Sequence, residues 1–291
     1  MEAVMLFSTI AVLTVFVSQS VHELGHAYAM RECRVRIIAI SLLGLPVEGW
    51  AVIKLPINHS FFPGIEWRVH PLSIVGAYVE CEEEDVQNLS RADQLYVHGM
   101  GPLAAVLFAL FTTLVLSVLV NFLNGFGIYP GMELLEAPYL IALPGVIVVI
   151  WRGRRLLCKY ALPISTLTFF AYVGMLIVED AGIPIITMGE TLEMIGSISP
   201  IGTEGSSDIM HQVVLAMIAG TVMSILINAG NLFGFVPLDG GRIVQTVLPV
   251  WAQSAYAEVT IRLLWLWLSL TVILAVPMAV VKMWLWISPW F

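Results

Sequence analysis

The sequence contains few charged residues. Only 12% of its 291 residues are Asp, Glu, Lys or Arg, whereas 59% are hydrophobic. Because a soluble globular domain carries about 25% charged residues, this composition excludes an ordinary soluble protein and predicts an integral membrane protein. The net charge of −8 also offers no basic surface, so a nucleic-acid partner is not expected.

The sequence has only three cysteines, and its N-terminal segment has no basic residues. Cys33, Cys81 and Cys158 are far apart and form no CxxC pair, which argues against a disulfide framework and favours free thiols. The first apolar segment lacks the positively charged start of a cleavable signal peptide and runs directly into the sequence HELGH. We therefore expect this segment to be a membrane helix of the protein.

The apolar runs predict six membrane spans. The number falls to five if the third run does not cross, because it is shorter than the roughly 20 residues that a membrane-spanning helix needs. The six expected spans are residues 4–30, 98–122, 138–151, 161–178, 209–233 and 262–284.

Lys and Arg are absent from two of the connections between these spans, residues 123–137 and 179–208. They occur in the other connections, and loops rich in Lys and Arg face the cytoplasm. The alternation predicts a multi-pass protein with an extracytoplasmic N-terminus and with HELGH near the cytoplasmic end of the first span. Lys282 departs from the pattern, although a lysine can snorkel to the outer interface.

The connection between the first two spans, residues 31–97, contains short β-strand patterns. RVRIIAISLLG, GWAVIKLPI and SIVGAYVE carry β-branched and aromatic residues between Gly and Pro breaks. The acidic run that starts at Glu80 is interpreted as a solvated cap before the next helix. The expected fold is thus an all-α polytopic membrane protein of about six transmembrane helices, with a small membrane-associated β-sheet between the first two spans.

Ionisable residues stand inside the first span. His22 and His26 are four residues apart, so a helix places them on one face with Glu23 beside them. This HExxH pattern supplies two zinc ligands and a general base. Chance is the alternative explanation, but ionisable groups within a membrane are costly and usually mark a functional site. A catalytic zinc normally has a third protein ligand, which must come from another span.

Asp239, within NAGNLFGFVPLDGGRI, is the best candidate for that ligand. It follows the fifth span, which also runs towards the cytoplasm, and Gly230, Gly234 and Pro237 predict a broken helix that lets the carboxylate turn inward. Taken alone, Asp239 would more often be the N-cap of a helix starting near Gly241, but HELGH on the same side favours the ligand. The other histidines are interpreted as interfacial or packing residues: His59, His70, His98 and His211.

Three separated stretches resemble the site-2 proteases, a family of intramembrane zinc metalloproteases. HELGH resembles the family's HExxH helix, NLFGFVPLDGG its Asp-bearing segment, and HPLSIVGAYV followed by HGMGP its strand and Gly-Pro helix start. The sequence departs from the family pattern at Val75, at Ala104 and Ala105 after Gly-Pro, at Gly234, and by its extra apolar segments at 138–178. The resemblance covers residues 1–122 and 205–250.

By this resemblance His22, His26 and Asp239 bind one zinc ion per chain, and Glu23 activates the water that attacks a peptide bond. Asn231 positions substrate or stabilises the reacting carbonyl. The family implies cleavage in or near transmembrane segments of membrane-protein substrates, as in regulated intramembrane proteolysis, with the bilayer and a transmembrane substrate as partners. The alternative is a polytopic metal transporter, or an inactive family member acting as a membrane binding protein.

The expected organisation has four parts. These are residues 1–122 with the HELGH helix, the strand-rich region and the Gly-Pro helix; residues 123–208 with additional apolar spans and an extracytoplasmic loop; residues 209–250 with the LDGG segment; and residues 251–291 with a C-terminal membrane helix.

Overall fold

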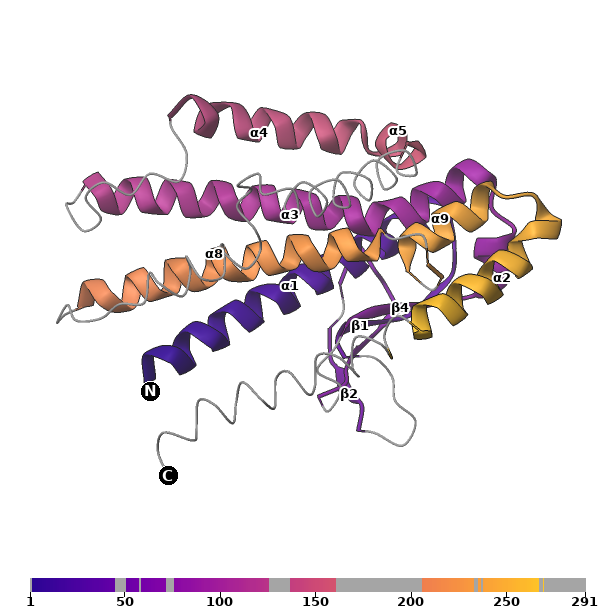
Figure 1. The fold of residues 1–291 in the computed structure, drawn as a ribbon, viewed down its shortest axis with the longest axis horizontal. Coiled ribbons are helices and arrows are strands. Elements are labelled where there is room, and N and C mark those ends of the chain that lie inside the picture. Colours follow the sequence, from indigo (N-terminus) through magenta and orange to yellow (C-terminus); the bar gives the residue numbers. More distant parts are fainter. Residues whose placement is uncertain are drawn as a thin grey trace, which may run out of the picture.

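The computed structural model describes residues 2–44, 51–57, 59–71, 76–125, 137–160, 206–232, 235–236, 238–266 and 269. Within these residues the protein is mostly helical, with one small sheet. Figure 1 shows long helices alongside one another, with the sheet at the end of the bundle where α1 ends. The described helices are α1 (Glu2–Glu32), α2 (Glu83–Gln87), α3 (Arg91–Gly125), α4 (Ala137–Arg152), α5 (Arg154–Lys159), α8 (Ser206–Asn231), α9 (Asp239–Val247) and residues 250–266.

Helix α1 packs between α3 and α8 at points where a small residue lets the backbones approach. A Cβ atom at Gly25 would lie 2.5 Å from the carbonyl oxygen of Met100 on α3. A Cβ atom at Gly220 of α8 would lie 2.6 Å from the Cβ of Thr14 on α1. Small residues at such contacts are typical of helix pairs in membranes. They fix the distance from α1 to both neighbours.

Two helices are long and apolar enough to cross a membrane, Leu6–Glu32 and Arg91–Phe122. Two shorter apolar helices, Leu140–Arg152 and Val213–Ile225, overlap the predicted third and fifth spans. The predicted span 161–178 and most of 262–284 lie outside the described residues. The six-span topology therefore stays a prediction.

The sheet between the first two long helices was predicted and is present. Its strands are β1 (Ile37–Leu43), β2 (Ile53–Leu55), β3 (Glu66–Val69) and β4 (Tyr78–Cys81), in the order β2-β3-β1-β4. Strand β1 runs parallel to β3 and antiparallel to β4, so β4 is an edge strand. A cluster formed by Ala27 of α1 with Ile40, Phe62 and Trp67 packs the sheet against α1.

The chain breaks its helical path between α8 and α9, as the Gly and Pro residues predicted. Helix α8 ends at Asn231 and α9 begins at Asp239. The turn folds so closely onto α9 that a Cβ atom at Gly241 would overlap the backbone of Phe235. Leu238, and not Asp239, is the N-cap residue. The Asp239 side chain is thereby available for contacts with α1.

Candidate active site

The ends of α8 and α9 bring their polar side chains to the histidines of α1. His22 Nε2 lies 2.8 Å from Asp239 Oδ2 and 3.2 Å from His26 Nε2. His26 Nε2 lies 3.2 Å from Asp239 Oδ1. All three residues are buried. Two imidazoles and a carboxylate thus converge on one point from segments separated by more than two hundred residues in sequence.

The His26 ring is fixed by α3. Its Nδ1 donates a hydrogen bond to the backbone oxygen of Val97 at 2.7 Å, which leaves Nε2 as the nitrogen that faces the cluster. Gly101, one turn further along α3, makes room for this ring, because a Cβ atom there would overlap it. His22 has no such outer support among the described residues, since its buried Nδ1 lacks a partner there.

The cluster has too few protons for its geometry. With the proton of neutral His26 on Nδ1, the lone pair of its Nε2 faces His22 Nε2 and Asp239 Oδ1, each 3.2 Å away. A neutral His22 can donate its own proton to only one of these neighbours. A cation among the three groups removes this repulsion. Two imidazoles and one carboxylate are a donor set of catalytic zinc sites, and a carbonyl on the far nitrogen is the usual support of a zinc-binding histidine. The residues therefore fit zinc.

Asn231 supports Asp239. Its Nδ2 donates a hydrogen bond to Asp239 Oδ2 at 2.7 Å and lies 3.1 Å from His22 Nε2. One turn earlier on α8, Asn228 Nδ2 lies 3.4 Å from the Ser18 hydroxyl of α1. Asn231 thus orients the carboxylate from the last residue of α8. The role in substrate positioning that the resemblance implies stays a prediction.

Glu23 completes the group. Together with His22 and His26 it offers ligand atoms that all lie within 4.8 Å of one another. Glu23 also lines a cavity of about 1160 Å³. The carboxylate is therefore next to the histidines and at a wall that solvent or a ligand can reach. This is the place that a general base needs.

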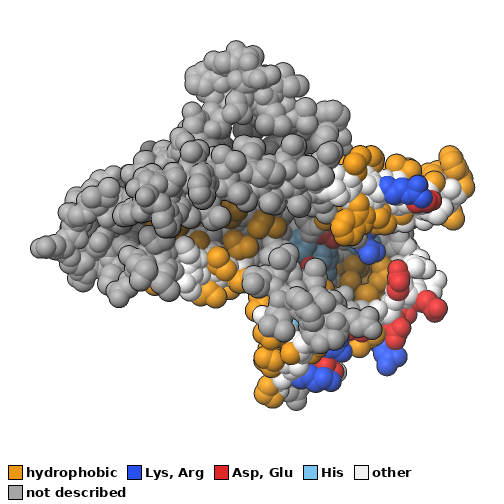
Figure 2. Space-filling view, turned by 60° about the horizontal axis from the view of Figure 1, so that its bottom comes forward, with side chains coloured by type: hydrophobic (Ala, Val, Ile, Leu, Met, Phe, Trp, Pro, Cys, Tyr) orange, Lys and Arg blue, Asp and Glu red, His pale blue; other side chains and the backbone are white. Residues whose placement is uncertain are grey.

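Six of the described helices and the edge strand β4 contribute residues to the wall of this cavity. Figure 2 shows the hollow, with histidine side chains in pale blue at its bottom and charged side chains near its rim. The polar residues that line it on α1, α3 and α9 are Glu23, His26, Arg91, Gln94, His98, Asp239, Arg242, Gln245 and Thr246. Two of them, His98 and Arg242, were not expected in a site, since His98 was interpreted as a packing residue and Arg242 was not singled out.

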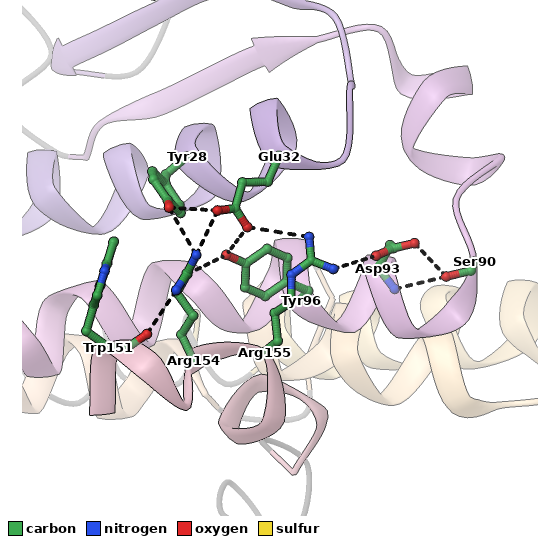
Figure 3. A network of polar contacts seen from close by, with 8 residues as sticks. All are labelled: Tyr28, Glu32, Ser90, Asp93, Tyr96, Trp151, Arg154 and Arg155. Carbon is green, nitrogen blue, oxygen red and sulfur yellow. Dashed lines mark hydrogen bonds and ion pairs between the residues drawn. The ribbon is translucent and has the colours of Figure 1, made fainter. Parts of the chain in front are cut away.

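A second polar cluster, the Glu32 network, lies at the end of α1 (Figure 3). Arg154 of α5 donates to Glu32 Oε1 at 2.8 Å and to the hydroxyl oxygens of Tyr28 and Tyr96. Both tyrosines donate their protons to the Glu32 carboxylate. Arg155 reaches Glu32 and Asp93. The network joins α5 to the C-terminal end of α1, the helix that carries HELGH, and to the N-terminal part of α3.

The structure brings together all five residues that the sequence singled out: His22, Glu23, His26, Asn231 and Asp239. Of the other histidines, His59 is exposed in the β2–β3 connection, His70 is buried beside Tyr78, and the side chain of His211 lies outside the description.

A HExxH helix among apolar helices, joined by a carboxylate and open to a cavity, is the arrangement of a membrane metallopeptidase. The family model for Peptidase family M50 matches residues 10–275. The chain belongs to this family, the site-2 protease family, as the sequence motifs indicated. The match also spans the segment 123–205 that the motifs had left unassigned. Members of the family are membrane-embedded zinc metalloproteases. Curated proteins gave no match.

Proposed function

We propose that the protein is an intramembrane zinc metalloprotease that cleaves peptide bonds in or near transmembrane segments of membrane-protein substrates. One observation carries the proposal: His22, His26 and Asp239 bring side-chain nitrogen and oxygen atoms to within 3.2 Å of one another, and Glu23 stands beside them at a cavity wall. Membership in the M50 family supports a peptidase with this donor set.

In this proposal His22, His26 and Asp239 hold the zinc ion through Nε2, Nε2 and a carboxylate oxygen. Bound zinc supplies a Lewis acid that lowers the pKa of water to about 7 and polarises a carbonyl. Glu23 accepts a proton from the attacking water at its carboxylate and gives it to the leaving amine. Asn231 holds the Asp239 carboxylate in place through its 2.7 Å hydrogen bond.

The substrate must present an extended segment, because the hydrogen bonds of a helix shield its peptide groups. Strand β4 is an edge of the sheet and lines the same cavity as Glu23. We propose that an unwound stretch of a transmembrane protein adds to β4 as a further strand. The Lys/Arg alternation supports cleavage on the cytoplasmic side of the membrane.

The test is a Glu23→Gln variant of the full chain. Glutamine keeps the size of the side chain and removes the base, so zinc content and thermal stability should stay the same while cleavage of a transmembrane substrate falls by about 10²–10⁴-fold. Glu258→Gln, on an exposed residue of the helix 250–266, is the matched control and should cleave normally.

The alternative function, metal transport, predicts a different result. A transporter needs ligands along a path and no base, so Glu23→Gln should still carry metal across vesicle membranes. Among the described residues the histidine–glutamate group is the only cluster of three or more metal-binding side chains, which favours a single-site hydrolase. Undiminished cleavage by Glu23→Gln would refute the proposed mechanism.

A further inference from the structure

Several nitrogen donors of the cavity, among them Arg91, Arg242 and His98, have no side-chain partner in the part of the chain that is described. Arg242 of α9 forms no ion pair or side-chain hydrogen bond with a described residue, and neither does the imidazole of His98 on α3. Of the carboxylates in the wall, Glu80 is paired with Arg68 and Asp239 with the histidines of α1. Glu23 and Glu83 also line the cavity. The cavity therefore offers cationic and donor groups that form no ion pair within its described wall.

Both groups lie next to the proposed zinc site. Arg242 follows Asp239 by three residues on α9, so it lies on the same helix face about 4.5 Å further along the axis. His98 follows Val97, whose backbone oxygen holds the His26 ring. Both side chains line the cavity. Donors from two helices thus lie at one cavity wall beside the metal ligands.

Arg242 lines the same cavity as β4, the strand to which a substrate would bind. Burial raises the pKa of the Cys81 thiol on β4, and the positive charge of Arg242 works against this increase. Glu83 on α2 lines the cavity too, but it forms no ion pair with Arg242. A strand added to β4 would therefore run past a guanidinium that is free to bind it.

We propose that Arg242 and His98 form a subsite that binds a substrate carboxylate close to the cleaved bond. This inference rests on the proposed function and names the side-chain class that the site selects, an Asp or Glu of the substrate. A guanidinium offers a planar pair of N–H donors that matches a carboxylate, and such charge-assisted bonds are about twice as strong as neutral ones. His98 of α3 supplies a further donor in the same cavity.

The experiment uses the full zinc-loaded chain and single-span substrates in which each residue around the cleaved bond is changed in turn to Asp, Asn or Lys. We expect one position at which Asp is cleaved about 10-fold or more faster than Asn. Arg242→Gln should abolish this preference while zinc content is unchanged, and Arg242→Glu should reverse it in favour of Lys. His98→Gln should reduce it by a smaller factor.

Two further variants keep the test decisive. Arg242→Lys retains the positive charge but lacks the planar guanidinium, so this variant should keep part of the preference for Asp. It also replaces Arg242→Gln in the test if the Gln variant folds poorly. Arg262→Gln removes an exposed arginine that pairs with Glu258 outside the cavity and should keep all of it. Equal cleavage of Asp and Asn substrates at every position, or an unchanged preference in Arg242→Gln, overturns the subsite and leaves the protease intact.

Binding separates the two proposals. The same substrates are bound to Glu23→Gln protein, and affinity is measured without turnover. If Asp substrates bind more tightly than Asn substrates and this difference depends on Arg242, the subsite is supported. If the wild-type chain cleaves no substrate, the proposed protease activity is refuted, and the binding result for the subsite still stands. Charge-independent binding overturns the subsite. Substrates with free and with amidated C-termini distinguish a side-chain carboxylate from a terminal one. If amidation of the C-terminus abolishes binding while Asp and Asn substrates bind equally, the assignment to an Asp or Glu side chain is overturned.

Discussion

Helix α1 carries two buried or half-buried polar clusters in an apolar bundle, and they differ in whether their hydrogen-bond donors and acceptors are matched. In the Glu32 network each carboxylate oxygen faces a hydroxyl or guanidinium donor, and Arg154 faces acceptors on three elements. In the histidine cluster, three close contacts among His22, His26 and Asp239 share at most one proton when both imidazoles are neutral. The first cluster is complete within the chain.

The difference teaches how structural and functional polar groups can be told apart. A structural cluster balances its own donors and acceptors, because unpaired polar groups are costly in an apolar environment. A cluster that keeps an excess of acceptors, at a cavity wall, needs a cation from outside the chain. The first three predictions below each perturb one of the two clusters.

Removal of the third ligand should have the largest effect. Asp239→Ala is expected to reduce bound zinc from one per chain to a small fraction of that, because a catalytic zinc needs three protein ligands. Metal analysis after dialysis measures it. Asp93→Ala removes a carboxylate of the Glu32 network and should leave zinc unchanged. Full zinc in the Asp239 variant would rule out this residue as a ligand.

Gly101→Ala should disturb the histidine cluster without removing a ligand. The added methyl group would overlap the His26 ring, so we expect zinc affinity to fall by about 10–100-fold, the loss typical of misplaced ligand support. Competition with a chromogenic chelator measures the affinity. Gly145→Ala is the matched control, because a Cβ atom at Gly145 meets nothing within 4 Å. Equal affinities in the two variants would contradict the packing described for His26.

Breaking the Glu32 network should cost stability and spare the metal. Glu32→Gln leaves Arg154 partly buried beside a neutral partner, which we expect to cost about 1–3 kcal/mol. Arg262→Gln, which breaks the exposed pair with Glu258, should cost no more than about 0.5 kcal/mol. Thermal unfolding in detergent compares them, and zinc content should be the same in both. Loss of zinc from Glu32→Gln would show that the two clusters are coupled.

The smallest effect concerns the thiols. Burial raises the pKa of Cys158 to about 12. Burial, and to a smaller extent the negative charge of Asp93, raises the pKa of Cys33 to about 11. Both thiols are therefore protonated at neutral pH and should react slowly with maleimide until the protein is unfolded. Rapid labelling of folded protein would contradict the packing at the end of α1.

Topology is better tested with a new cysteine on the exposed surface of α2. Glu84→Cys in a variant without native cysteines should react with an impermeant maleimide only after the membrane is opened, because the Lys/Arg alternation predicts a cytoplasmic sheet region. Labelling on intact cells would overturn the predicted orientation.

Sequence reasoning singled out residues that the structure brings together, because their signals are local or follow from topology. Four-residue spacing placed His22 and His26 on one face, and glycines and proline marked the break before Asp239. Three of the four strands were predicted from their β-branched residues. Strand β3 was missed because its sequence EWRV carries two charges, which pair with each other in the sheet.

Other features depend on contacts that no local pattern encodes. Glu32 and Arg154 are 122 residues apart and meet only because α5 packs at the end of α1 and α3. His98 and Arg242 lie on different helices, and each looks like an ordinary polar residue of a helix end. Their shared position in the cavity follows from the packing of α9 against α3, which the sequence alone does not specify.

The separation of the ligands along the chain has a consequence for biogenesis. Asp239 follows His22 by 217 residues, so at synthesis rates of about 5–20 residues per second it leaves the ribosome roughly 10–40 s later. During that interval the nascent chain has both histidines and the glutamate but no complete metal site. For the proposed protease this means that neighbouring proteins at the insertion machinery meet no finished catalytic centre during that interval, and that metal binding would report correct insertion of the α8–α9 region.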